Sequence, residues 1–265
     1  MLKAGGLVVA LAALAAVAGP SLTPFDPASQ DLALRLAGPS AEHLFGLDEL
    51  GRDILARMLM GARVSFLVGL TVVGVSSIVG TLLGAMAGYC GGVVDDVISR
   101  VIDTLLAFPG LLLAIALVAV LGPSLITVLF ALTIIGWVGY ARLVRGQVLR
   151  AREFEYVQAA RALGAGAPRI LWRHVLPTAL PALLVQVTLG MAGAVIGEAS
   201  LSFLGLGVQP PAPSWGTMLN GGRAHIMDAP HLTVFPGLAI ALLVLGFNFL
   251  GEGLRNRFDP GGHGR

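Results

Sequence analysis

The sequence predicts an all-α membrane protein, a polytopic bundle of about six transmembrane helices with a cytoplasmic helical loop. Composition is the first reason: 56% of the 265 residues are hydrophobic and 12% are charged, whereas soluble domains carry about 25% charged residues. Six apolar stretches also have roughly the length needed to cross a bilayer. Their apolar runs are continuous, without the alternation of barrel strands, and backbone in lipid must then form helices.

We place the spans at residues 4–19, 64–88, 98–121, 125–149, 178–203 and 232–254. The first stretch, within an N-terminal segment 1–21, has two interpretations. It is either a transmembrane helix or a signal-like anchor, because its Ala/Leu/Val run ends in small residues that suit a cleavage site. In the third span, Pro109 is expected to kink or start the membrane part, after an amphipathic helix over 93–108.

The distribution of arginine predicts the orientation. Seven arginines lie in the last part of the fourth span or between it and the fifth: Arg142, Arg145, Arg150, Arg152, Arg161, Arg169 and Arg173. By the positive-inside rule this loop, residues 150–177, is cytoplasmic. Alternation then places residues 22–63 outside, a core of five spans at 64–254, and a cytoplasmic tail at 255–265. The acidic 89–97 loop, also inside, does not follow the trend.

Several kinds of site are excluded or disfavoured. Lys3 is the only lysine, and a Walker-type phosphate loop requires a lysine after its glycines. Cys90 is the only cysteine, so no intramolecular disulfide or cysteine-cluster metal site can form. The histidines are scattered without metal-ligand spacing, and no catalytic constellation is recognised. A net charge of +2 does not suggest a nucleic-acid surface.

Small and polar residues within the spans suggest packing and pathway sites. Gly80, Gly84 and Gly88 recur every four residues and form a face that lets another helix approach closely. Glu198 and Ser202 near the end of the fifth span, with Asn248 in the last, are candidates for lining or gating a pathway. For Glu198 the alternative is a role in capping the irregular turn that follows.

The loop at 150–177 is expected to contain two short helices at an angle. The first runs from Glu153 to Leu163 and ends at Gly164. The second, 168–175, starts at Pro168 and is stopped by Pro177. From the residues alone, the loop is either an amphipathic connector lying on anionic headgroups or a docking surface for a partner.

Residues 157–177, "VQAARALGAGAPRILWRHVLP", resemble the cytoplasmic loop of the membrane subunits of ATP-binding-cassette importers. Further segments are similar to the dipeptide/oligopeptide/nickel branch of that family. They are "FGLDELGRDILARMLMGARVSFLVGL" (45–70), "RVIDTLLAFPGLLLAI" (101–116), "GEASLSFLGLGVQPPAPSWGTML" (197–219) and "FNFLGEGLRNRFDP" (247–260). The resemblance covers about residues 22–260, and it departs from the family at Gln158, where the motif has glutamate.

The resemblance implies a non-catalytic permease subunit in a bacterial or archaeal cytoplasmic membrane. Such a subunit forms half of a translocation pathway for di- or oligopeptides; a nickel or glutathione-type importer is the alternative within the family, and an ATP-independent secondary transporter is the alternative class. Implied partners are a homologous second permease subunit, two ATPase subunits that bind ATP and Mg, an extracytoplasmic substrate-binding protein and membrane lipid. The implied ATPase-coupling residues are Glu155, Gln158, Ala159, Ala160, Arg161, Gly164, Arg169 and Pro177.

Overall fold

A computed structural model describes residues 1–258 of the chain, and residues 259–265 lie outside the described part. The α-helices are α1 Leu2–Ala18, α2 Ile54–Cys90, α3 Gly92–Leu106, α4 Gly110–Leu121, α5 Leu125–Ala151, α6 Glu155–Ala162, α7 Ala167–Ile170, α8 Leu176–Phe203, α9 Trp215–Gly222 and α10 His231–Phe258. Within residues 1–258 there is no β-strand, only an isolated bridge between Leu47 and Asp53. The predicted all-α membrane fold is therefore confirmed.

The number of spans differs from the prediction of about six. Four helical stretches are long and apolar enough to cross a membrane: α2, α5, residues 167–203 ending in α8, and α10. A fifth span exists if the bent pair α3 and α4 is counted as one. The apolar helix α1 has 17 residues, shorter than these four. Of the predicted cytoplasmic tail, only residues 255–258 are described, and they form the last turn of α10.

The predicted span 98–121 is not one straight helix. α3 and α4 meet at an angle of 84°, with Pro109 as the cap before α4 at φ −58° and ψ 119°. Proline lacks an N–H, and it disfavours helical geometry at the residue before it, here Phe108. The amphipathic helix α3 therefore ends before the proline, and a separate apolar helix begins after it.

Helix α2 begins earlier than predicted, at Ile54. The Asp53 side chain caps it by accepting a hydrogen bond from the backbone N–H of Ala56 at 2.7 Å. The first ten residues of α2 thus belong to the predicted external segment 22–63. A helix of 37 residues is about 55 Å long, so α2 extends beyond a bilayer core of about 30 Å.

The three predicted packing glycines lie against α5. A Cβ added at Gly80 would sit 2.5 Å from the carbonyl oxygen of Trp137, and one at Gly84 would collide with the backbone of Ala141. One at Gly88 would also be too close to α5. Because only glycine permits this separation, α2 and α5 pack backbone against backbone, and they form the most extensive helix pair in the bundle.

α1 and α10 form a second close pair. A Cβ at Gly5 would lie 2.7 Å from the carbonyl oxygen of Gly246.

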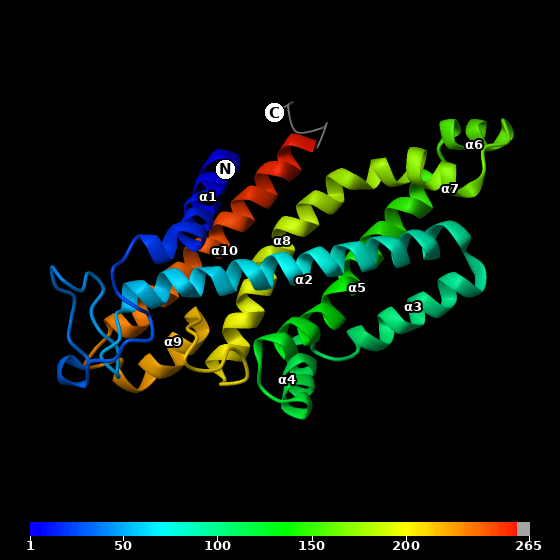
Figure 1. The fold of residues 1–265 in the computed structure, drawn as a ribbon. Helices are drawn as coiled ribbons and strands as arrows, with labels where there is room; N and C mark the ends of the chain where they lie inside the picture. Colours follow the sequence, from blue (N-terminus) through cyan, green and yellow to red (C-terminus); the bar gives the residue numbers. More distant parts are fainter. Residues whose placement is uncertain (259–265) are drawn as a thin grey trace.

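The end of α1 is also held by α2. The guanidinium of Arg63 donates to the carbonyl oxygens of Ala16 at 2.6 Å and Val17 at 2.8 Å, which satisfies two groups that a helix end leaves unpaired. Figure 1 shows the start of α1 and the end of α10 on the same side of the molecule as α6 and α7.

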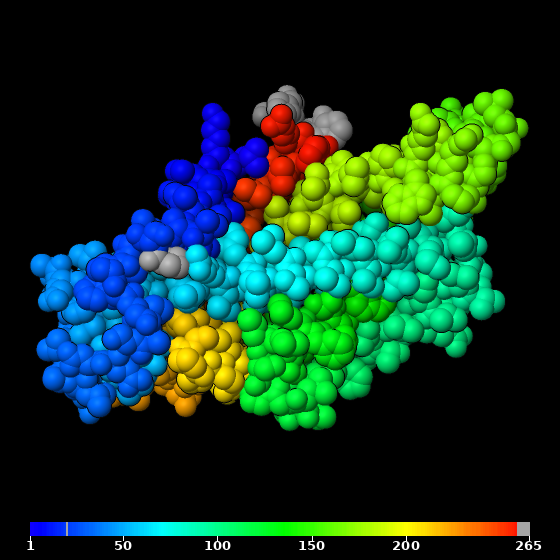
Figure 2. Space-filling model, in the orientation of Figure 1, coloured from blue at the N-terminus to red at the C-terminus, as the bar shows by residue number. Residues whose placement is uncertain are grey.

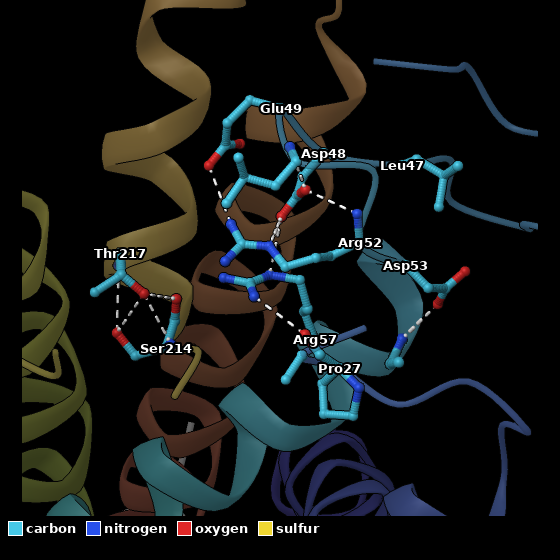
Figure 3. A network of polar contacts seen from close by, with 12 residues as sticks. Pro27, Leu47, Asp48, Glu49, Arg52, Asp53, Arg57, Ser214 and Thr217 are labelled. Atoms are coloured by element: carbon cyan, nitrogen blue, oxygen red, sulfur yellow. Dashed lines mark hydrogen bonds and ion pairs between the residues drawn. The ribbon is translucent and has the colours of Figure 1, made fainter. Parts of the chain in front are cut away.

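The irregular residues 22–53 are anchored by a buried charge network (Figure 3). Oδ2 of Asp48 lies 2.7 Å from Nε of Arg52 and 3.3 Å from Nε of Arg57. All three side chains are nearly inaccessible, and Arg57 also donates to the carbonyl oxygen of Pro27 at 3.2 Å. One carboxylate therefore joins residues 22–53 to the first turn of α2.

The glycine contact makes a direct prediction about stability. Gly84→Ala is expected to lower the free energy of unfolding by about 1–3 kcal/mol, since the new methyl group would force α2 away from α5. Gly74→Ala on the same helix is the control, because its Cβ would contact nothing. Thermal unfolding of the two purified variants in detergent measures the difference. Equal losses would contradict the contact.

The charge network around Asp48 makes a second prediction about stability. Asp48→Asn leaves the buried guanidinium of Arg57 without a carboxylate and that of Arg52 with Glu49 alone, and we expect a loss of about 3–5 kcal/mol in unfolding free energy. The control is Asp103→Asn, which removes the exposed ion pair between Asp103 and Arg142 and is expected to cost less than about 1 kcal/mol. If both substitutions shift the detergent melting temperature alike, Asp48 is not the anchor.

Candidate functional site

A small apolar cluster holds the loop between α5 and α8 to the bundle. Val148 and Ala151 of α5, Val157 of α6, Ile170 of α7 and Val175 before α8 are all buried together. Most of the remaining side chains of α6 and α7 are exposed. Figure 2 shows this yellow-green region projecting from one end of the molecule. The cluster therefore fixes the root of the loop and leaves its tip free for a partner.

The tip is bent where the sequence predicts. α6 ends at Ala162, and Gly164 adopts φ +83°, the left-handed conformation that closes helices. The N–H of Ala165 reaches back to the carbonyl oxygen of Ala160 at 3.1 Å. Pro168 then lies in the first turn of α7, where a missing N–H costs nothing.

The prediction that Pro177 stops the second short helix is wrong. The backbone remains helical from Ala167 through a π-helical turn at Leu171–Val175 and into α8, so residues 167–203 form one continuous helix. A proline ring collides with the carbonyl four residues before it in a regular α-helix. The wider π-turn directly before Pro177 gives the ring room.

The eight predicted coupling residues mostly share one surface. Ala160 is half-buried; the others, Glu155, Gln158, Ala159, Arg161, Gly164, Arg169 and Pro177, are exposed. All but Pro177 lie on α6, the bend or α7, and Pro177 lies in the first turn of α8. Nε2 of Gln158 donates to the carbonyl oxygen of Glu153 at 3.2 Å, a bond that the family's glutamate could not donate. Their coupling role stays a prediction.

Two apolar residues of this surface were missed by the sequence reasoning. Leu163 at the bend is 89% exposed, and Trp172 in the π-turn is 58% exposed. Exposed large apolar side chains on a projecting tip are typical of a docking surface. The signal was present in the sequence, as isolated apolar residues within a basic loop.

The acidic helix α3 pairs with arginines of α5. Arg145 makes a two-pronged ion pair with Asp95, at 2.5 and 2.7 Å, and Arg142 contacts Asp103 at 3.2 Å. In the acidic 89–97 loop, which did not follow the arginine trend, Asp95 is thus paired with one of the seven arginines, Arg145. The arginines on the projecting tip, Arg161 and Arg169, form no ion pair within residues 1–258.

Glu198 is fully buried and contacts Ser202. The hydroxyl of Ser202 donates to Oε1 of Glu198 at 2.6 Å and accepts from the N–H of Val208 at 3.3 Å. This arrangement favours the alternative in which Glu198 supports the irregular turn after α8. Asn248 donates to the carbonyl oxygen of Val244 in its own helix at 3.0 Å. A pathway role for these residues stays a prediction.

A cavity of about 400 Å³ lies between α2, α4, α5 and α8. Its lining is mostly apolar or glycine, with four neutral polar side chains: Ser76, Tyr140, Gln186 and Ser200. Glu198, Ser202 and Asn248 are not among the lining residues. The sequence reasoning did not identify this cavity, because its walls come from four different helices whose packing is not visible in the sequence.

Tyr140 of α5 enters this space at a glycine of α8. A Cβ added at Gly190 would collide with the hydroxyl oxygen of Tyr140. Gly190 therefore admits the tyrosine ring between the two helices, where it forms one wall of the cavity. Among residues 1–258, no cluster of His, Cys, Asp or Glu could hold a metal ion.

Comparison with known proteins gives consistent matches. The family described as "Binding-protein-dependent transport system inner membrane component" matches residues 80–262. The chain is 47% identical to the dipeptide transport system permease protein DppC of Alkalihalophilus pseudofirmus, over 97% of this chain and 84% of the relative. It is also 47% identical to the glutathione transport system permease protein GsiD of Salmonella paratyphi A, over 98% and 86%.

A solved structure shares the fold. An inward-facing form of the MetNI methionine ABC transporter contains a chain that superposes with a TM-score of 0.63, at 17% identity, over 76% of this chain and 95% of that one. At this identity the likeness establishes the arrangement of helices alone. The family assignment rests on the family match and on the 47% identical relatives. The chain belongs to the family of binding-protein-dependent transport system inner membrane components.

Proposed function

We propose that this chain is a permease subunit of an ATP-driven importer, and that it forms half of the translocation pathway for di- or oligopeptides. The names of its relatives support this cargo class, since one is a dipeptide permease and the other a glutathione permease. Glutathione is therefore the second candidate cargo. Because the family is described as binding-protein-dependent, an ATP-independent secondary transporter fits less well.

One observation carries the proposal. The continuous helix 167–203 begins on the projecting tip and ends beside the cavity, where α8 contributes Gln186, Gly190 and Ser200 to the wall. An uninterrupted helix transmits a displacement along its axis more faithfully than a loop. Movement imposed on α7 by a partner therefore moves the cavity wall. The helix 167–203 would thus link the projecting tip to the cavity as one element that can adopt two positions.

The projecting tip suits the docking of one ATPase subunit. The complete importer would contain two such subunits, one of them docked on this chain. The tip presents Arg161, Arg169 and the exposed Leu163, a mixture of charge and apolar area suited to a reversible protein contact. ATP and Mg²⁺ belong to those partners, because this chain has a single lysine and no Walker-type loop. The present chain would then be a non-catalytic subunit.

The remaining partners follow from the other surfaces. A homologous second permease subunit would close the open side of the cavity. Residues 22–53 and α9 lie at the end of the molecule opposite the projecting tip (Figure 1), and they are the surface proposed for the extracytoplasmic substrate-binding protein. Lipid surrounds the exposed apolar faces of the spans.

The proposal is tested by co-expressing the chain with its candidate partner subunits and reconstituting the complex in vesicles. ATP-dependent uptake of a labelled dipeptide, requiring the binding protein, is the expected result. Uptake driven by an ion gradient without any ATPase would contradict it, as would ATP-dependent uptake of free nickel alone.

The docking surface makes a third prediction. Reversing two charges, Arg161→Glu with Arg169→Glu, is expected to reduce retention of the ATPase subunits during purification and to lower transport-linked ATP hydrolysis at least about tenfold, as disruption of complementary charges costs more than about 1.4 kcal/mol. The control is Arg35→Glu, an exposed arginine of the external segment. If the double variant retains both its ATPases and its hydrolysis, the coupling assignment is wrong.

A further inference from the structure

The cavity between the spans contains one unpaired amide. The hydroxyl of Ser76 donates to the carbonyl oxygen of Thr133 at 3.4 Å, and that of Tyr140 donates to the backbone carbonyl oxygen of Gln186 at 3.5 Å. The side-chain amide of Gln186 has no hydrogen-bond partner in the described residues 1–258. At the depth of a membrane span, an amide without a partner is costly, so it needs water, cargo or another subunit.

The surroundings keep this amide accessible. Gly139 of α5 faces it: a Cβ added there would lie 3.6 Å from Nε2 of Gln186. On α8 the residue about two turns further along, Gly193, is exposed, and a Cβ added to it would meet no atom within 4 Å. Glycines therefore leave room beside Gln186 where larger side chains would cover its polar group.

The chemistry of the wall matches a peptide group. A primary amide offers donors and an acceptor, and a peptide bond offers one donor and one acceptor. In a trans peptide bond the N–H and C=O point in opposite directions, so the Gln186 amide would bond one of them at a time, with Oε1 accepting from the N–H or Nε2 donating to the carbonyl oxygen. The other polar lining groups, Ser76, Tyr140 and Ser200, are uncharged hydroxyls, so the wall offers hydrogen bonds without a fixed charge that would trap a cargo terminus.

We propose that the side-chain amide of Gln186 forms a hydrogen bond with a peptide bond of the cargo as the cargo passes through the cavity. The inference rests on the proposed function, and it deepens that function by naming the group recognised. It selects for cargo with an amide bond, a property shared by dipeptides and glutathione. Gln186 thus adds selection within the membrane to any selection made by the external binding protein.

The test is uptake by the reconstituted complex with binding protein saturated by cargo, so that the binding protein's affinity does not limit the rate. The cargoes are alanyl-alanine and its analogue methylated on the peptide nitrogen, which cannot donate. Wild-type protein is expected to transport the unmodified peptide faster. Gln186→Met keeps the side-chain length but removes the amide. In this variant the uptake rate of alanyl-alanine should fall about three- to tenfold, the range of one hydrogen bond. The preference for alanyl-alanine over the methylated analogue should disappear.

Two further variants make the result specific. Thr188→Val is the matched control on the same helix, because its hydroxyl donates to Val185 within α8 and packs against Gly251 of α10; it should retain both rate and preference. Gln186→Asn keeps an amide with a shorter reach, and it should retain the preference at a lower rate. If Gln186→Met is poorly folded, this variant still tests the inference.

Each outcome has a defined meaning. Unchanged uptake in Gln186→Met, or a preference that survives the loss of the amide, overturns the inference. Dissociation of the second permease subunit in both Gln186 variants also overturns it, because the amide would then be a subunit contact. Failure of the wild-type complex to take up any peptide with ATP would instead refute the proposed function. The two failures are therefore distinguishable.

Discussion

The close packing of α2 on α5 is the contact on which the rest of the bundle depends. In a bilayer no hydrophobic effect draws helices together, so stability comes from dispersion and from the proximity that small residues allow. Glycines at 80, 84 and 88 provide that proximity along three successive turns. With α5 held in place, its arginines can meet the acids of α3, and Tyr140 reaches α8 beside the cavity. A wider separation would disturb both the ion pairs and the cavity.

The polar groups of the structure differ in burial and pairing between its anchoring contacts and its projecting tip and cavity. Asp48 and its arginines are buried and paired through ion pairs, which ties residues 22–53 to α2. Glu198 supports a turn through Ser202 in the same buried manner. The charged groups of the projecting tip are by contrast exposed, and the side-chain amide of Gln186 in the cavity has no hydrogen-bond partner within residues 1–258. Groups available for exchange of partners therefore occur where a transporter must make and release contacts.

The helix from the tip to the cavity shows why local rules can mislead in a membrane protein. Proline at position 177 should end a helix, and one turn later Pro181 should do the same. Both are accommodated instead, the first by a π-turn and the second inside α8. Within a membrane span, as at Pro181, ending a helix exposes unpaired backbone groups, so a distorted helix is less costly than an interrupted one. The result is a continuous connection that a soluble loop would not provide.

The sequence by itself determined the membrane class, the four long spans, the bend at Gly164, the glycine packing face and, through a family resemblance, the permease assignment. These depend on composition, local periodicity and motifs, which act over short stretches of chain. The sequence located the break at Pro109, and tertiary structure alone decided its 84° angle, the continuity of residues 167–203, the pairing of α3 with α5 and the cavity containing Gln186. Each of these depends on which residues meet across different helices, and helix–helix geometry is not encoded in the pattern of any single helix.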